Sequence, residues 1–474
     1  MTPKDNIVIL GAGESGVGAA ILAQQQGHPV FVSDLGQITP AYQQELEHYN
    51  IAYEQGQHSL HKILQADVVI KSPGIPDHIA LIKQLEAQGT PIIDEIEWAS
   101  RHSNSKVIAI TGSNGKTTTT KLIHHLLVTG GLEAGLGGNI GYSWARQVAL
   151  NPKPYYVLEL SSFQLDRIQD FCPAIAVLLN ITPDHLDRYN YDMAQYAAAK
   201  LRLVKNNSQA QVIIYNEEEK WITDGLANRA NKHPQDQLLG VSPTESGQES
   251  QLFKVPHSNY EQAKSELSLK GRHNWFNMQC AVLAAEQVGV TPEAIAQALR
   301  TFENDPHRLE TILTLHQVTY INDSKATNVD AVYWALDAMT QPVVWIVGGV
   351  DKGNDYSPLL DLVRQKVRAV VCLGRQNEKI KAALEGVHEI VVEAVSMEEA
   401  IKIASLYAEA GDVVLLSPAC ASFDLFENYQ ARGNKFRAIL EEQYNILTEG
   451  ISVTMNLNWK QNPVDHQTDD SPQE

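Results

Sequence analysis

The chain has 474 residues, and its acidic side chains outnumber the basic ones, giving a formal net charge of -19. This charge argues against a protein that binds nucleic acid or coats a membrane, because those polyanionic partners require surfaces rich in Lys and Arg. The four cysteines lie far apart and without metal-ligand spacing, which indicates free thiols in a reducing compartment.

The N-terminal part of the chain predicts a first α/β domain, residues 1–103. Residues 1–6 are polar and lack the plan of a signal peptide, and no apolar run nears the roughly 20 residues that cross a bilayer. We therefore expect a cytoplasmic protein. Short apolar strands alternate with helical stretches, and we place strands at 7–10, 30–32 and 68–70, a helix ending near 26, another at 94–99 and a polar boundary at 101–105.

The same alternation continues and predicts two further α/β domains, as the length suggests at roughly 100–200 residues per domain. We expect the second at 104–305 and the third at 306–448, with the boundary near Asp305-Pro306, and a disordered polar tail at 449–474. Residues 216–265 are polar and irregular, which indicates surface loops around a few strands. Strands are predicted at 107–110, 156–160, 175–179, 343–347, 369–373 and 413–416, and a helix at 274–288.

A glycine-containing loop, Thr111–Thr118, lies between a predicted strand and a predicted helix. Its glycines let backbone N–H groups point inward, Lys116 can reach the β- and γ-phosphates, and the Thr117 hydroxyl can bind Mg²⁺. Ile110 stands where the common form of this motif has its first glycine. A plain turn capped by threonines is the alternative, which the agreement of strand, loop and helix disfavours. We predict an ATP site formed by Gly112, Ser113, Asn114, Gly115, Lys116, Thr117 and Thr118.

A metal-bound nucleotide also needs acidic ligands. Glu159 is near the C-terminal end of a predicted buried strand, and in a parallel sheet that end faces the ligand crevice. It is therefore a candidate Mg²⁺ ligand. A solvated carboxylate at a strand end explains it equally well, and the residues alone leave both explanations open.

The first loop of the chain, Gly11–Gly16, fits G-x-G-x-x-G between a strand and a helix, and Asp34 lies about twenty residues further on. This pattern is typical of dinucleotide sites. It predicts a phosphate or diphosphate on the helix N-terminus but does not specify NAD. A tight turn without a ligand is the alternative.

Several stretches, read together, identify a family. They are Thr111–Thr118, Gly137-Gly138-Asn139-Ile140-Gly141, Leu158–Leu165 with the sequence LELSSFQL, Asn180–Arg188 with NITPDHLDR, Tyr196-Ala197-Ala198-Ala199-Lys200, Gly271-Arg272-His273-Asn274, His307-Arg308-Leu309-Glu310, Asn322–Asn328 with NDSKATN, and Leu416–Asp424 with LSPACASFD. In this order, over about residues 5–445, they resemble the Mur ligase family, which adds amino acids to the peptidoglycan precursor.

The resemblance implies a fold and a reaction. The fold is α/β with three domains: an N-terminal Rossmann-like domain, a central P-loop mononucleotide-binding domain and a C-terminal Rossmann-like domain. The form of residues 322–328 and 416–424 is similar to that of the members that use UDP-N-acetylmuramoyl-L-alanine, D-glutamate and ATP. The resemblance thus implies an acyl-phosphate intermediate and Mg²⁺, with two ions. We expect a monomer that binds these small molecules, no nucleic acid and no membrane.

Matched positions also imply site residues. The match weakens after Asp34, because Leu35 and Gly36 stand where some members carry Thr and Arg, so the uracil contacts are not assigned. Without the family, ion pairs would explain Arg308 and Asp323. The implied contacts are Glu14, Ser15, Asp34, Gly74 and Asn139 for the UDP-substrate, Asn274, Arg308 and Asp323 for ATP, and Lys325, Thr327, Lys352, Ser422 and Tyr429 for D-glutamate. Ser422 should also cap a helix that begins at Phe423.

The resemblance implies the catalytic groups as well. Lys116 and one Mg²⁺, held by Thr117 and Glu159, would hold the migrating phosphoryl group. His185 would help to bind a second ion, and Lys200 would carry a carbamate derived from CO₂ that supports the metals. From the residues alone, His185 is a loop histidine and Lys200 an ordinary helix lysine.

Two other functions compete with D-glutamate addition. One stays among ligases: another amino-acid-adding Mur enzyme or a folylpolyglutamate synthetase, whose third-domain signatures are not found here. The other is an NAD-binding regulator or dehydrogenase fused to an NTPase switch, which would use Gly11–Gly16 and Asp34 for NAD.

Overall fold

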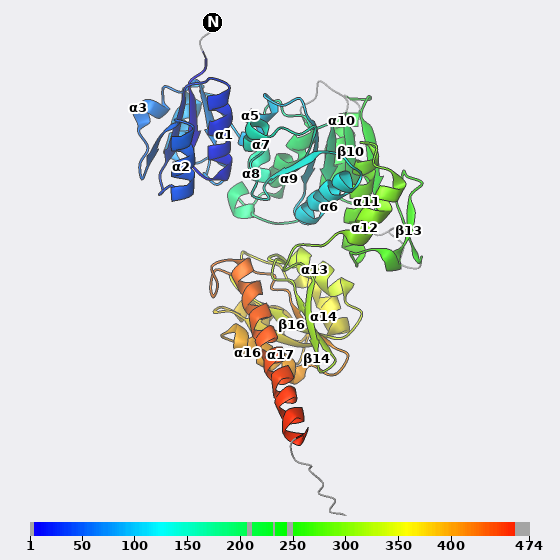
Figure 1. Cartoon of the computed structure of the whole chain (residues 1–474). Helices are drawn as coiled ribbons and strands as arrows, with labels where there is room; N and C mark the ends of the chain where they lie inside the picture. The colour runs from blue at the N-terminus through cyan, green and yellow to red at the C-terminus, as the bar shows by residue number, and fades with distance from the viewer. Residues whose placement is uncertain (1–3, 206–210, 231–232, 244–249, 460–474) are drawn as a thin grey trace, which may run out of the picture. The chain divides into compact units, whose positions relative to one another are not determined.

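The computed structural model describes residues 4–205, 211–230, 233–243 and 250–459 (Figure 1). The chain forms two compact units, residues 1–303 and residues 304–474. In the part of the chain that is described, no helix is both long and apolar enough to span a membrane.

The first sheet of the first unit is fully parallel and has the strand order β3-β2-β1-β4-β5. Its central strand is apolar and buried along its whole length, as expected for a strand covered on both faces. Its strands are β1 Ile7–Leu10, β2 Val30–Asp34, β3 Ala52–Gln55, β4 Val68–Lys71 and β5 Ile92–Ile93, and its helices are α1 Glu14–Gln25, α2 Pro40–His48, α3 Leu60–Ile63 and α4 Ala80–Ala87.

The second sheet of this unit is also parallel, in the order β11-β10-β9-β6-β8-β7. Its strands are β6 Lys106–Thr111, β7 Ala134–Gly138, β8 Tyr155–Glu159, β9 Ile175–Leu178, β10 Val212–Asn216 and β11 Gln237–Val241. The hairpin β12 Leu252–Lys254 and β13 Glu261–Ala263 lies apart from this sheet. The helices are α6 Lys116–Thr129, α7 Trp144–Leu150, α8 Ser162–Leu165, α9 Met193–Leu201, α10 Lys220–Ala230, α11 Arg272–Glu286 and α12 Pro292–Thr301, with short 3-10 turns η1 Leu186–Tyr189, η2 Arg202–Val204 and η3 Lys264–Glu266.

Helix α5, Glu95–Ser100, links the two sheets of the first unit. Its Glu97 is fully buried and its carboxylate accepts hydrogen bonds from the consecutive backbone N–H groups of residues 169–171, at 2.9 to 3.0 Å. The same carboxylate pairs with Arg101 at 3.0 Å. These donors fix the connection between the sheets, because the buried carboxylate of Glu97 would be costly without them.

We expect Glu97→Ala to lower the free energy of unfolding of this unit by about 1–3 kcal/mol, because it leaves three backbone N–H groups and the partly exposed guanidinium of Arg101 without their acceptor. The urea midpoint monitored by fluorescence measures the loss. Glu133→Ala is the control, because that side chain is 75% exposed in its ion pair with Lys153. Equal midpoints for the two variants would contradict the structural role of Glu97.

The second unit has one sheet in the order β14-β15-β19-β16-β17-β18. It is parallel except for its edge strand β14, which runs antiparallel to β15. The long helix α17, red in Figure 1, packs its Phe436, Ile439 and Leu440 against the apolar side of the sheet and α16. The elements are β14 Glu310–Leu315, β15 Val318–Asn322, β16 Val343–Val347, β17 Val367–Leu373, β18 Val391–Ala394 and β19 Val413–Leu416, with α13 Val329–Ala338, η4 Ser357–Leu359, α14 Leu360–Lys366, α15 Glu378–Leu384, α16 Met397–Tyr407 and α17 Tyr429–Trp459.

The predicted α/β class with parallel sheets is confirmed, and each predicted strand is present within two residues of its expected ends. The helix expected to begin at Phe423 is wrong. Residues 423–428 form turns, and the next helix begins at Tyr429, where the side chain of Asn428 accepts from the Ala431 N–H at 2.7 Å and so caps the helix. Of the predicted tail, residues 449–459 belong to α17 and residues 460–474 lie outside the described residues. The three domain limits stay predictions.

Candidate active site

The phosphate loop joins β6 to α6, and two of its glycines are required by close packing. Gly115 has a φ of 80°, and a Cβ there would lie 2.7 Å from Oδ1 of Asn277. A Cβ on Gly112 would lie 2.9 Å from the Cβ of Leu179. A side chain at Gly112 would therefore displace its neighbours, and one at Gly115 would in addition strain the left-handed backbone. The loop leaves β6 at a carboxyl end of the sheet, where open α/β sheets bind ligands.

Side chains from a neighbouring loop hold the phosphate loop in shape. Oδ1 of Asn180 accepts from the N–H groups of Ser113, at 2.9 Å, and Asn114, at 2.7 Å. The Ser113 hydroxyl lies 3.0 Å from the hydroxyl of Tyr196. Sequence reasoning assigned no role to Asn180, Tyr196 or Asn277. The first two lie within the family stretches, which was the available signal.

Two lysines converge on one carbonyl of this loop. Nζ of Lys116 donates to the carbonyls of Gly112 and Ser113, both at 2.8 Å. Nζ of Lys200, from α9, donates to the same Gly112 carbonyl at 2.7 Å. Lys200 is 2% exposed and lies over the ring of Tyr196 at 4.7 Å. Burial, and then the charge of Lys116, hold the pKa of Lys200 well below its usual value, so its neutral amine is favoured.

Glu159 ends β8 and is buried against the phosphate loop, opposite Ile110 of β6. One carboxylate oxygen accepts from the side-chain amide of Asn139 at 2.7 Å, while the other, Oε2, is buried without a hydrogen-bond partner. A buried unpaired carboxylate oxygen is costly unless a cation completes it, and carboxylate oxygens are preferred ligands of Mg²⁺. The residues present therefore fit a magnesium ion at Glu159.

His185, the other histidine or carboxylate predicted to bind a metal, is more exposed than Glu159. His185 has a left-handed backbone, with φ 51°, and its ring packs edge-on against Phe163. Its Nε2 lies 3.5 Å from the carboxylate of Asp184, and its side chain is 48% exposed. Among the described residues, no group of three or more His, Cys, Asp or Glu side chains is arranged to hold a metal ion. An ion at Glu159 would thus need hydroxyl and phosphate oxygens, such as the Thr117 hydroxyl, to fill its other positions.

The N-terminal glycine loop, Gly11–Gly16, is hydrogen-bonded to the carboxylate of Asp34 at the end of β2. Oδ2 of Asp34 accepts from the Ala12 N–H at 2.6 Å, and Oδ1 accepts from the Gly36 N–H at 2.8 Å. Asp34 therefore shapes the loop directly. Ser15 is half-buried in the first turn of α1, and the space beside Gly74 is open, since nothing lies within 4 Å of a Cβ built there.

Glu14, the predicted substrate contact in this loop, is engaged by a helix of the second sheet. Its carboxylate accepts from Arg146 Nη2 at 2.9 Å and from the Ser143 N–H at 3.0 Å. Arg146 also pairs with Glu45. Of the predicted substrate contacts, Asn139 is hydrogen-bonded to Glu159 and Glu14 is paired with Arg146. Sequence reasoning did not single out Arg146.

Two of the predicted nucleotide contacts beyond the phosphate loop are held by hydrogen bonds. Asn274 lies in the first turn of α11 and donates to the Lys270 carbonyl at 2.8 Å. In the second unit, Asp323 follows β15 and accepts from the Ser417 hydroxyl at 2.9 Å and the Leu309 N–H at 3.1 Å. Burial raises the pKa of Asp323 to about 7, against these hydrogen bonds and the charge of Arg308, which lower it.

Three loops of the second unit carry the predicted D-glutamate contacts. Nζ of Lys325 lies 4.0 Å from the ring centre of Tyr429. The loop of Lys352 pairs with the loop of Ser422 through backbone hydrogen bonds between Val350 and Ala421, at 2.8 and 3.2 Å. Ser422 is buried, Lys352 is exposed, and Thr327, just before α13, is half-buried.

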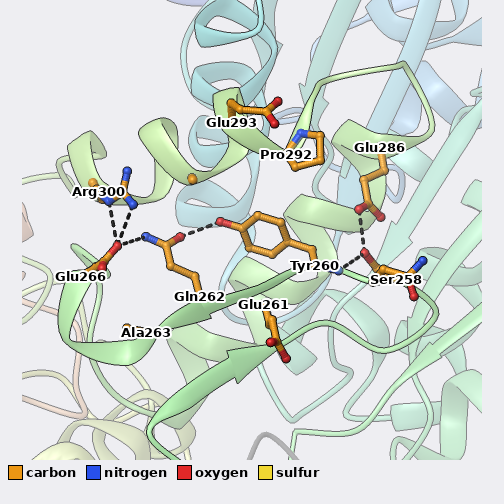
Figure 2. Close-up of a pocket in the computed structure, with 12 residues that line it drawn as sticks. Ser258, Tyr260, Glu261, Gln262, Ala263, Glu266, Glu286, Pro292, Glu293 and Arg300 are labelled. Carbon is orange, nitrogen blue, oxygen red and sulfur yellow. Dashed lines mark hydrogen bonds and ion pairs between the residues drawn. The ribbon is translucent and has the colours of Figure 1, made fainter.

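A separate cavity of about 830 Å³ lies between the β12–β13 hairpin and helices α11 and α12 (Figure 2). Figure 2 shows two of its carboxylates turned to local partners: Glu266 to Arg300, at 2.7 Å, and Glu286 to Ser258, at 2.6 Å. None of the predicted site residues lines it.

Three family models match successive parts of the chain. Residues 5–94 match the N-terminal domain of MurD-like Mur ligases, residues 110–285 the Mur ligase middle domain, and residues 307–420 the Mur ligase glutamate ligase domain. The chain belongs to the Mur ligase family. It is accordingly an ATP-dependent ligase that forms amide bonds, which confirms the predicted enzyme class.

Relatives of this Mur ligase extend over most of its length. It is 47% identical over 435 residues to a UDP-N-acetylmuramoylalanine–D-glutamate ligase of Christiangramia forsetii, covering 91% of this chain and 98% of the relative. It is 47% identical over 450 residues to a protein of the same name from Cytophaga hutchinsonii, covering 93% and 99%.

Solved structures support the Mur ligase fold. A pseudomurein peptide ligase type C from Methanothermus fervidus matches with a TM-score of 0.60 at 19% identity, over 93% of this chain and 100% of that one. A UDP-N-acetylmuramate-alanine ligase from Thermotoga maritima matches with a TM-score of 0.56 at 17% identity, over the same shares.

Proposed function

We propose that this Mur ligase joins D-glutamate to UDP-N-acetylmuramoyl-L-alanine with cleavage of ATP, as a cytoplasmic step of peptidoglycan precursor synthesis. The observation that carries the chemistry is the buried site where Lys116, Lys200 and the unpaired oxygen of Glu159 meet the phosphate loop. The choice of substrates follows from relatives of that name at 47% identity over nine-tenths of the chain.

The reaction must make a carboxylate reactive. In the proposed mechanism a carboxylate oxygen of UDP-N-acetylmuramoyl-L-alanine takes the γ-phosphoryl group of ATP, giving an acyl phosphate and ADP. The amine of D-glutamate then attacks the acyl carbon, and the tetrahedral intermediate expels phosphate and loses a proton. Such transfers depend mainly on positioning and on neutralising charge. Lys116 and the inward N–H groups of the phosphate loop supply that charge.

Magnesium fits this site, and its charge would neutralise the phosphate oxygens. We assign one ion to Thr117 and Glu159, on the evidence of the unpaired Oε2 of Glu159. We assign a second to His185 and to a carbamate on Lys200. Asn139 would orient Glu159, because it holds the other carboxylate oxygen at 2.7 Å.

The state of the Lys200 amine supports the proposed carbamate. Its nitrogen adds to the carbon of CO₂ and releases one proton, so a side chain that disfavours its positive charge becomes an anion. Burial at 2% exposure and the neighbouring charge of Lys116 both favour the neutral amine that this addition requires. The resulting anion would sit among cations, which stabilise it.

We assign the other predicted contacts as follows. The residues assigned to the UDP end of the substrate are Glu14, Ser15, Asp34, Gly74 and Asn139. Those assigned to ATP, besides the phosphate loop, are Asn274, Arg308 and Asp323. Those assigned to D-glutamate are Lys325, Thr327, Lys352, Ser422 and Tyr429. We further propose that the enzyme acts as a monomer on these small molecules, with domains at 1–103, 104–305 and 306–448.

A panel of amino acids tests the substrate choice. Given ATP, Mg²⁺ and UDP-N-acetylmuramoyl-L-alanine, the enzyme should release ADP and form a product of the expected mass with D-glutamate. It should remain near background with L-glutamate, L-alanine, L-lysine and meso-diaminopimelate. Turnover with one of these and not with D-glutamate would instead indicate another member of the family. Tight NADH binding without any effect of the UDP-substrate would support the NAD-dependent alternative.

A further inference from the structure

Arg432, in the first turn of α17, is a buried side chain that holds three separate loops. It is 2% exposed. Its Nε donates to the Ser324 hydroxyl at 3.0 Å and its Nη2 to the Ser324 carbonyl at 2.9 Å. Its Nη1 donates to the carbonyls of Cys420, at 3.1 Å, and Gly348, at 3.4 Å. One guanidinium thus joins positions that are 108, 84 and 12 residues away in the chain.

These three loops are the ones to which the D-glutamate contacts are assigned. Ser324 directly precedes Lys325, and its hydroxyl also donates to the Tyr429 carbonyl at 2.8 Å. Gly348 begins the loop that leads to Lys352, and Cys420 lies two residues before Ser422. A change at Arg432 would therefore remove a side chain that bonds to all three loops, leaving the Val350–Ala421 backbone pair and the Ser324–Tyr429 hydrogen bond to connect them.

The charge of Arg432 has no direct carboxylate partner. Its acceptors are backbone carbonyls and one hydroxyl, and no Asp or Glu oxygen of the described residues lies within 4.0 Å of the guanidinium. Asp323 and Asp424 act on it only from further away. Burying an unpaired cation is costly, so such a charge needs a compensating role.

We propose that Arg432 is the positioning residue of the amino-acid site: it sets the geometry of the three loops and its buried charge favours an acidic amino acid. This inference rests on the proposed function. An amino acid with a side-chain carboxylate gains from a fixed positive charge in a low-dielectric region, whereas its amide analogue gains little. The planar guanidinium suits this positioning role, because its several N–H donors point in fixed directions toward the three loops, whereas a single Lys amine cannot reach all three.

The test compares Arg432→Met and Arg432→Lys with Arg437→Met. Arg437 lies on the same helix but is 33% exposed, in an ion pair with Glu310. In Arg432→Met we expect the KM for D-glutamate to rise about 100-fold, and the KM for ATP to change by less than about twofold. The preference for D-glutamate over D-glutamine in kcat/KM should fall about tenfold. In Arg432→Lys, which keeps the charge, the KM should rise about tenfold with that preference retained. Arg437→Met should match the wild type.

The outcomes separate this inference from the proposed function. A wild-type enzyme that ignores D-glutamate overturns the proposed function and, with it, the inference. If the wild type uses D-glutamate, an unchanged KM for D-glutamate or an unchanged D-glutamate preference in folded Arg432→Met overturns the inference alone. Thermal melting establishes folding. If Arg432→Met does not fold, Arg432→Lys decides, and a KM for D-glutamate within twofold of the wild type overturns the inference.

Discussion

Replacement of Lys116 by alanine is expected to lower kcat by at least about 10³-fold, since it removes the cation that the phosphate loop offers to the triphosphate. Its Nζ donates to the carbonyls of Gly112 and Ser113. It is therefore already ordered at the loop and needs little reorganisation to meet a phosphate. ADP release in the presence of all substrates measures the loss.

A lysine next to the loop but outside it provides the control. Lys106 begins β6 and is exposed, with its Nζ on the Gln287 carbonyl at 3.2 Å. Lys106→Ala should keep activity within about twofold, because a surface charge at this position contributes little. If Lys116→Ala released ADP at the wild-type rate, the assignment of the phosphate loop would fail.

Lys116 also acts on its neighbour. Its charge helps to hold the pKa of Lys200 below the usual value, second only to burial. Removing Lys116 should therefore let the Lys200 amine keep its proton more readily, and a protonated amine cannot add CO₂. Part of the loss in Lys116→Ala is thus expected to act through Lys200, so the effects of the two substitutions should not add.

Features set by local sequence were predictable. The strand at Ile7–Leu10 and the loop Thr111–Thr118 follow from a run of apolar residues, glycine spacing and a helix start, all within a few positions of one another. The antiparallel edge strand Glu310–Leu315 was not foreseen. Its two threonines are exposed and its other residues half-buried, without a regular alternation, and its direction is set by a tight connection to its neighbour rather than by its own pattern.

The helix expected after Ser422 illustrates a competing local signal. A serine before an apolar-acidic stretch favours a helix start, yet the chain makes a single turn there, with the N–H groups of Leu425 and Phe426 bonded to the Ser422 carbonyl. Asn428 caps the helix six residues later. Asn is at least as good a cap as Ser, and propensity alone could not choose between the two sites.

Site features that depend on distant partners were beyond sequence reasoning. The sequence around Arg432 does not indicate that its side chain is buried and bonded to several loops, since two of its partner residues lie 84 and 108 positions away. Glu14 matched a substrate contact by position, but its ion pair with Arg146 spans 132 residues. The free oxygen of Glu159 was equally hidden, although the strand-end position of this residue pointed to a metal. The sequence could therefore identify chemical groups, while tertiary packing determined which of them are paired.

Lys200→Ala is expected to leave very little activity, on the order of a 10²- to 10³-fold loss in kcat, because an anionic support for the metals would be lost. Added formate, acetate or propionate should restore part of it. The space vacated by this buried side chain lies beside the cation Lys116, so a small carboxylate that enters it can take the place of the proposed carbamate. Lys205→Ala is the control, since this lysine follows the same helix and is exposed; it should show neither loss nor rescue.

A second measurement tests the modification without turnover. The wild-type protein equilibrated with isotopically labelled CO₂ should give a carbamate signal by NMR that Lys200→Ala lacks and Lys205→Ala retains. The signal should weaken as the pH falls, because protonation of the amine removes the nucleophile. Since burial depresses the pKa of Lys200, this weakening should occur at a lower pH than for an exposed lysine. Near-wild-type activity of Lys200→Ala with no response to carboxylic acids would show that the buried amine acts as an ordinary structural lysine, held by the Gly112 carbonyl.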